Sequence, residues 1–286
     1  MAENGEASVE SKVNAEEVAE VKEVAGKQVR QMLGDEEQAG NYARYVLQEP
    51  ETGRSNALII AYAATRPGTR ERYSYVAALS DLPCPVMFVR IRSGYFLGFG
   101  GNTEIEDEVA LAQEQVRSEF GVDKRNVIAC GGSAGAIRAL WHACDSGYGH
   151  AVLGAPLVKA GDFLQEESVA RARERIVPTI APSGGTAEDT RDWLNTIVSE
   201  KLNNPAAETT LHVFISERDE LYPYSLPWIE DACRTNPKLE LDLTLASYDG
   251  HREHRKLFRP YLRAKALEVV SSIDESAVES DASASR

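Results

Sequence analysis

Short apolar runs and amphipathic stretches alternate along the chain from residue 41 onward. A continuous apolar run of about four to eight residues is typical of a strand buried on both faces of a sheet, whereas apolar positions three or four apart indicate a helix. Buried strands are predicted at 57–65, 85–91, 126–130, 151–157, 210–216 and 241–247, with a further strand at 41–49. Helices are predicted at 104–120, 136–143, 226–234 and 255–271. This alternation predicts an α/β fold with a mostly parallel central sheet and helices on both of its faces.

One segment interrupts this alternation. Residues 157–209 hold two helical stretches, at 163–176 and 188–202, and no convincing strand. We expect a helical cap inserted over one end of the sheet. The alternative is a pair of crossover helices, one of them enlarged.

The two ends of the chain differ from this body. Residues 1–40 combine an acidic start with apolar positions at helical spacing between Val13 and Leu33, which predicts an acidic tail followed by an amphipathic helix. That helix either packs on the main domain or forms the contact of a homodimer. Residues 272–286 are small, polar and acidic, and we expect a disordered tail there. The domain is therefore expected to span 41–271.

Composition narrows the classes of partner. The 286 residues carry a formal net charge of −14, which disfavours binding to a nucleic-acid backbone. No apolar run approaches the roughly 20 residues of a membrane span, and the acidic start lacks the apolar core of a secretory signal, so we expect a cytoplasmic protein. The four cysteines form no C-x-x-C pair and are expected to be reduced thiols. We expect neither a metal nor a cofactor.

Residues 131–135 read GGSAG and fit the pattern G-x-S-x-G. They follow a predicted strand and open a predicted helix, which is the setting of a nucleophile elbow with Ser133 at its tip. The turn is tight, so the flanking glycines are needed where helix and strand nearly touch. The alternative is a glycine-rich turn that binds an anion at the start of a helix.

A serine hydroxyl needs a base near pH 7, and the base needs a carboxylate to orient it. His251 follows the predicted strand at 241–247 and is the favoured base, with His254 as the alternative. Asp219 lies on the loop after the strand at 210–216 and is the favoured acid. Glu217 and Glu220 lie on the same loop and are its alternatives.

Four segments together resemble the core of the α/β-hydrolase superfamily: GVDKRNVIACGGSAGAIRAL, AVLGAPLVKAGDFL, VFISERDELYPYSL and SYDGHREH. The resemblance covers about residues 41–271 and implies the α/β-hydrolase fold with Ser133, Asp219 and His251 as its triad. It also implies an oxyanion hole formed by the backbone of Ala134 and of the loop near Ala64. That loop reads AYAATRPG and lacks the His-Gly-Gly-Gly of lipases and esterases. The segment MFVRIRSGYFLGFGGN and the short outline of the predicted domain are also faintly similar to the capsule-biosynthesis and accessory-secretion branch of this superfamily.

Three functions fit these residues. The first is a serine hydrolase that cleaves an ester, thioester or amide of a small molecule through an acyl-enzyme. The second is an acyltransferase that uses the same triad and passes the acyl group to a glycan or another polar acceptor. The third is a scaffold of the same fold without catalysis. The presence of all three triad residue types in chain order favours an enzyme.

Overall fold

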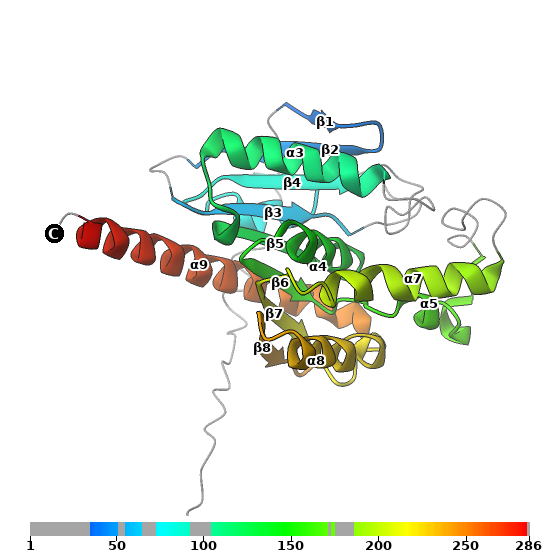
Figure 1. Cartoon of the computed structure of the whole chain (residues 1–286). Coiled ribbons are helices and arrows are strands. Elements are labelled where there is room, and N and C mark those ends of the chain that lie inside the picture. Colours follow the sequence, from blue (N-terminus) through cyan, green and yellow to red (C-terminus); the bar gives the residue numbers. More distant parts are fainter. Residues whose placement is uncertain are drawn as a thin grey trace, which may run out of the picture.

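The computed structural model describes residues 35–50, 55–64, 73–91, 104–170, 173–174 and 186–284. These segments form one sheet of eight strands in the order β1-β2-β4-β3-β5-β6-β7-β8 (Figure 1). Strands β3 to β8 pair in parallel, and β1 and β2 pair antiparallel at one edge. The strands are β1 Glu37–Ala39, β2 Ala43–Gln48, β3 Leu58–Tyr62, β4 Val86–Ile91, β5 Val127–Gly132, β6 His150–Gly154, β7 Thr209–Ile215 and β8 Leu239–Leu245.

Helices cover both faces of the sheet, as the sequence predicted (Figure 1). The helices are α2 Val76–Leu79, α3 Glu104–Phe120, α4 Ala134–Ser146, α5 Ala160–Phe163, α7 Ala187–Leu202, α8 Leu226–Thr235 and α9 His251–Ala284. Apolar residues of α3, α4, α7 and α8 form one core with the first face of the sheet, and those of α2 and α9 form a second core with the other face. The central strands are buried on both faces, which explains their continuous apolar runs.

The antiparallel edge contains a strand that the pattern did not predict. Strand β1 has three residues and returns on β2 through a turn at Gly40, whose φ is 68°. Glycine adopts this left-handed conformation without steric cost. Residues 1–34, which include the predicted amphipathic helix, lie outside the described residues.

The segment 157–209 contributes to the body of the domain. Helix α7 packs on α4, and its Leu194 and Val198 are about 1% exposed within the first core. It lies between β6 and β7 in the chain, which is the position of a crossover helix. Before it, α5 and a 3₁₀ turn at Glu167–Val169 occupy part of the stretch for which a longer helix was predicted.

The last helix is longer than the apolar pattern indicates. It was predicted at 255–271, but α9 begins at His251 and continues to Ala284, so it includes most of the residues expected to form a disordered acidic tail. Packing supports it as far as Ile273, which is 8% exposed, and Asp274 accepts hydrogen bonds from Ser55 and from the backbone of Asn56. Within the described residues, no helix has both the length and the apolar character needed to cross a membrane.

Candidate active site

Ser133 lies at the sharp turn between β5 and α4. Its φ is 56° and its ψ is −124°, a backbone conformation that residues other than glycine rarely adopt. Its backbone N–H donates to the carbonyl of Gly154 at the end of β6, 2.8 Å away, which holds the turn against the sheet. The side chain is therefore held at the carboxyl edge of the sheet, where it is partly exposed.

Two glycines allow the strand and the helix to approach each other at this turn. A Cβ on Gly131 would lie 2.4 Å from the carbonyl oxygen of Gly135. A Cβ on Gly135 would lie 2.5 Å from the carbonyl oxygen of Tyr62, the last residue of β3. Any side chain at either position would force the backbones apart, so the pattern G-x-S-x-G is a steric requirement of this turn.

The structure brings the three predicted triad residues together. Nε2 of His251 lies 2.9 Å from Oγ of Ser133, and Nδ1 of His251 lies 3.1 Å from Oδ2 of Asp219. The three residues follow β5, β7 and β8, and these parallel strands all end at the same edge of the sheet. Residues that are 118 and 32 positions apart in the chain thus become neighbours.

Asp219 is an ionised hydrogen-bond acceptor in this arrangement. Burial by itself would raise the pKa of Asp219, but the hydrogen bonds and charge of His251, with donors from Leu221 and Tyr248, outweigh it and lower the pKa. The Leu221 N–H donates to Oδ1 over 2.9 Å, and the Tyr248 hydroxyl donates to Oδ2 over 2.8 Å. Because a carboxylate only accepts, Nδ1 of His251 donates to it, and in the neutral ring Nε2 is left to accept the hydroxyl of Ser133.

Tyr248 is a site residue that the sequence analysis missed. It is 2% exposed, and its carbonyl accepts the hydroxyl of Ser216 over 2.7 Å. Its place three residues before His251 indicated only that it is near the site. The hydrogen bond from its hydroxyl to Asp219 depends on how the loops after β7 and β8 pack together, and the sequence does not show this packing.

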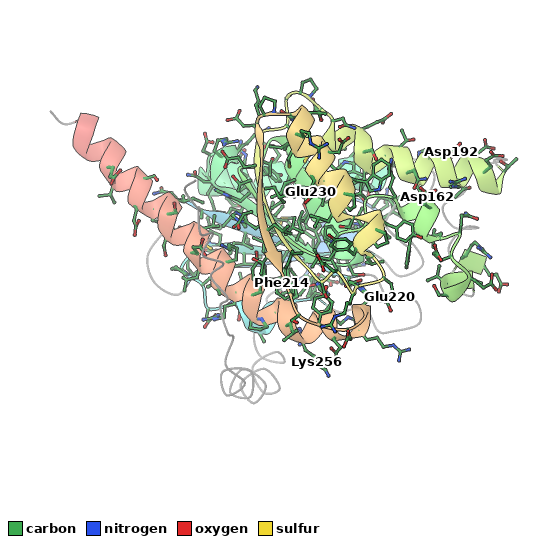
Figure 2. The ribbon with its side chains drawn as sticks, turned by 90° about the horizontal axis from the view of Figure 1, so that it is seen from below. Asp162, Asp192, Phe214, Glu220, Glu230 and Lys256 are labelled. Carbon is green, nitrogen blue, oxygen red and sulfur yellow. The ribbon has the colours of Figure 1, made fainter. Side chains whose placement is uncertain are left out.

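Neither alternative acid takes the place of Asp219. Glu217 is exposed to solvent. Glu220 accepts the backbone N–H of His251 over 2.5 Å and so caps the first turn of α9 (Figure 2 shows Glu220 near the start of this helix). Gly250, with φ of 71°, makes the turn into the helix just before His251. Glu220 therefore acts on the backbone of His251, and Asp219 contacts its ring.

The alternative base, His254, makes no hydrogen bond with Ser133, whose hydroxyl is instead contacted by His251. His254 lies one turn further along α9, is 1% exposed, and its two ring nitrogens have no hydrogen-bond partner among the described residues. Burial and the neighbouring His251 lower the pKa of His254 to about 4, whereas Asp219 acts weakly in the opposite direction. The geometry therefore favours His251 as the base.

The predicted oxyanion-hole residues flank the turn. Ala134 is the first residue of α4, whose opening N–H groups have no partner within the helix. Ala64 follows β3, and its N–H donates to Oγ of Ser74 over a long 3.3 Å. Residues 65–72, the rest of that loop, lie outside the described residues. The oxyanion-hole roles of Ala134 and Ala64 both stay predictions.

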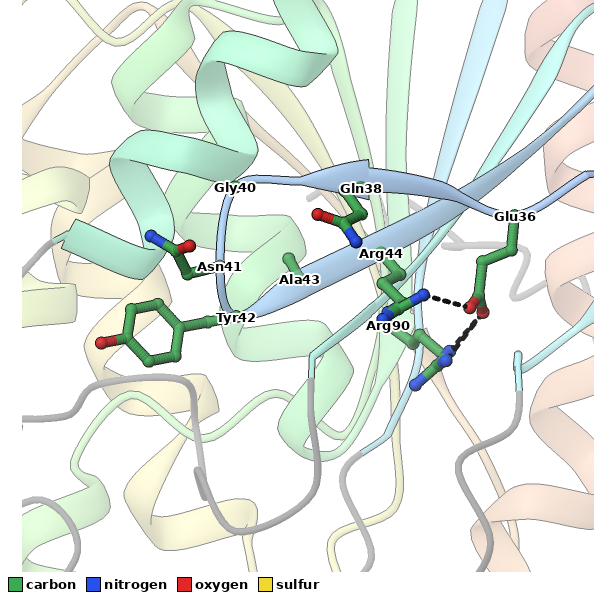
Figure 3. Close-up of a pocket in the computed structure, with 8 residues that line it drawn as sticks. All are labelled: Glu36, Gln38, Gly40, Asn41, Tyr42, Ala43, Arg44 and Arg90. Atoms are coloured by element: carbon green, nitrogen blue, oxygen red, sulfur yellow. Dashed lines mark hydrogen bonds and ion pairs between the residues drawn. The ribbon is translucent and has the colours of Figure 1, made fainter.

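A separate polar pocket lies at the antiparallel edge of the sheet, away from the triad (Figure 3). Its volume is about 530 Å³, and Glu36 bridges Arg44 and Arg90 within it at 3.1 and 2.7 Å. The carboxylate of Glu36 thus already pairs with both guanidinium groups of this pocket. No cluster of side chains suited to a metal ion occurs in the parts of the chain that the structure describes.

The sequence matches no protein-family model and no curated protein. Its fold is similar to that of the capsule O-acetyltransferase of Neisseria meningitidis serogroup A in complex with CoA, with a TM-score of 0.63, 14% identity and coverage of 82% of this chain and 98% of that one. The fluorophosphonate-binding serine hydrolase F of Staphylococcus aureus aligns with a TM-score of 0.51, 16% identity and coverage of 80% and 91%. The acylaminoacyl peptidase of Pyrococcus horikoshii aligns with a TM-score of 0.58, 12% identity and coverage of 82% of this chain but 40% of that one. These likenesses and the sheet order show that the chain has the α/β-hydrolase fold.

Proposed function

We propose that this protein is a serine enzyme that cleaves an ester, thioester or amide through an acyl-enzyme on Ser133. The observation that carries the proposal is the unbroken chain of contacts from Oγ of Ser133 through the ring of His251 to the carboxylate of Asp219. A serine, a base within hydrogen-bond reach and a group that orients the base are the requirements for an activated nucleophile.

The triad residues have distinct roles in this mechanism. As Oγ of Ser133 attacks the acyl carbonyl carbon, its proton passes to Nε2 of His251, and the carbonyl oxygen becomes an oxyanion. Asp219 stabilises the imidazolium through Nδ1–H, and the backbone N–H of Ala134 would face the oxyanion. His251 then gives its proton to the leaving group as the carbon–leaving-group bond breaks. Water, activated by the same ring, releases the acid and restores the Ser133 hydroxyl.

Transfer of the acyl group to a hydroxyl acceptor is a second candidate, in which the acceptor takes the place of water. The likeness to the capsule O-acetyltransferase spans nearly the whole of that chain, and this supports testing a glycan acceptor. The two candidates share the triad and differ only in what attacks the acyl-enzyme. Product analysis with an activated ester, in the presence and absence of a sugar acceptor, separates them.

The first experiment is covalent labelling with a fluorophosphonate, followed by peptide mapping. We expect the label on Ser133 of the wild-type chain. Ser133→Ala should lose both the label and all turnover of an activated ester, with an unchanged circular dichroism spectrum, because the substitution removes one oxygen from a partly exposed side chain. A label on a different serine, or none on a folded wild-type chain, would contradict the proposal and favour a scaffold.

A further inference from the structure

Three aromatic rings follow one another along the first two turns of α9. The ring of His254 is parallel to that of His251, with an interplanar angle of 4° and centroids 5.4 Å apart. On its other side it stacks on Phe258, with an angle of 20° and centroids 5.1 Å apart. These distances lie in the range of offset-stacked aromatic pairs. His251 therefore contacts a flat ring on the side toward the protein interior.

Two glycines fix the position of the His254 ring. A Cβ on Gly154 would lie 2.4 Å from Nε2 of His254, and a Cβ on Gly132 would lie 3.0 Å from its Cε1. These glycines end β6 and β5, two neighbouring parallel strands, and β5 leads directly into the turn that carries Ser133. The ring thus lies against bare backbone at the base of the candidate site.

Further aromatic side chains enclose the same ring. Phe214 of β7 and Tyr248, the partner of Asp219, lie with their ring centroids 6.2 and 6.0 Å from that of His254 (Figure 2 labels Phe214). The ring therefore contacts the surroundings of all three triad residues: the strand that ends at Ser133, the tyrosine that holds Asp219, and the base itself.

We propose that His254 is a positioning residue for the reaction at Ser133: its stacked ring holds the plane of His251 and presents an aromatic face to the positive charge that His251 gains. This inference rests on the proposed function. A ring free to turn about χ2 would lose its simultaneous contacts with Ser133 and Asp219. An aromatic face within about 6 Å of a cation attracts it, and such pairs, from exposed to desolvated, are worth roughly a 3- to 30-fold change in rate. Because burial lowers its pKa to about 4, His254 is neutral near pH 7 and does not repel that charge.

The test compares substitutions that keep or remove the flat ring. His254→Phe keeps it, whereas His254→Leu and His254→Met fill the volume without it. We expect kcat for an activated ester, and the rate of labelling by a fluorophosphonate, to stay within about 3-fold of wild type in the Phe variant and to fall about 3- to 30-fold in the Leu and Met variants. KM should change little. His150→Leu is the matched control, because His150 is also a largely buried histidine with a pKa of about 4. His150 begins β6, so it lies at the amino ends of the parallel strands, whereas the triad lies at their carboxyl ends.

A second measurement does not depend on activity. The ¹⁵N resonances of His251 report which ring nitrogen carries the proton. We expect a protonated Nδ1 and an unprotonated Nε2 in the wild type and in His254→Phe, and averaged resonances in His254→Leu or His254→Met. Equal rates and equal resonances in the Phe, Leu and Met variants would overturn the inference, as would a Phe variant as slow as the others. If wild-type Ser133 is never labelled, the proposed function fails, and the resonances still decide whether His254 positions His251.

Discussion

Three histidines in the described part of the chain contact a carboxylate, and two of these contacts, those of His251 and His142, differ sharply in their surroundings. At the carboxyl edge of the sheet, His251 lies 3.1 Å from Asp219, and its side chain is 29% exposed. Between α3 and α4, Nε2 of His142 lies 2.7 Å from Glu106, and both side chains are 1% exposed. The shorter and more buried contact is thus the one that no substrate can reach.

The buried region is a structural link between elements. Glu106 also pairs with Arg138, 3.3 Å away, and the ring of His142 stacks on Tyr62 at the end of β3 with an angle of 4°. Gln113 donates to the Tyr62 hydroxyl over 2.6 Å, which joins α3 to the sheet. A histidine–carboxylate contact therefore does not identify a catalytic site by itself. Exposure, and a third group such as Ser133 on the free ring nitrogen, make the difference.

The largest effect that separates the two regions is expected at Asp219. Asp219→Asn keeps the shape but replaces an acceptor with an amide that can favour the wrong tautomer of His251. The loss in kcat should approach the roughly 10⁴-fold seen when the acid of a serine triad is changed in this way. Steady-state kinetics on an activated ester measures it. Glu217→Gln, on the same loop and exposed, is the control and should stay within a few-fold of wild type.

The reverse pattern is expected at Glu106. Glu106→Gln removes a buried charge that faces Arg138 and His142, so it should lower the free energy of unfolding by about 3–5 kcal/mol. Urea denaturation measures the change. The rate per folded molecule should stay within a few-fold of wild type, because no triad residue contacts this network. A folded Glu106→Gln protein that reacts as slowly as Asp219→Asn would show that the two regions act as one.

A smaller effect should appear when stability is followed against pH. Burial lowers the pKa values of His150 and His254 to about 4 from an ordinary value of 6.5. The fold therefore favours their neutral forms, and this contribution to stability is present above pH 6.5 and is lost as the pH falls toward 4. Thermal melting midpoints should fall across that window. The melting midpoint should fall less in a protein that carries both His150→Gln and His254→Phe. If it falls as much as in the wild type, other groups cause the pH dependence.

The sequence predicted the order of strands and helices well because central strands buried on both faces have unambiguous apolar runs. It also predicted a tight turn from strand to helix at Ser133, where a Cβ on Gly131 or Gly135 would meet neighbouring backbone. It did not predict the roles of Tyr248 and Glu220, because both depend on how two loops meet across the sheet edge. The extent of α9 was missed for a related reason: its last turns have a polar sequence without an apolar stripe. The homodimer contact and the cytoplasmic location stay predictions.

The backbone of Ser133 has a consequence for how this fold would change if its chemistry were no longer needed. A side chain held at a φ of 56° costs of the order of 1–3 kcal/mol, and glycine would avoid that cost. The fold itself thus penalises a serine at this position, and the proposed reaction would give a reason to keep it. In related chains without the proposed activity, we would expect Ser133 to be replaced early, most favourably by glycine. The strained turn at Ser133 therefore supports the proposed role of its hydroxyl.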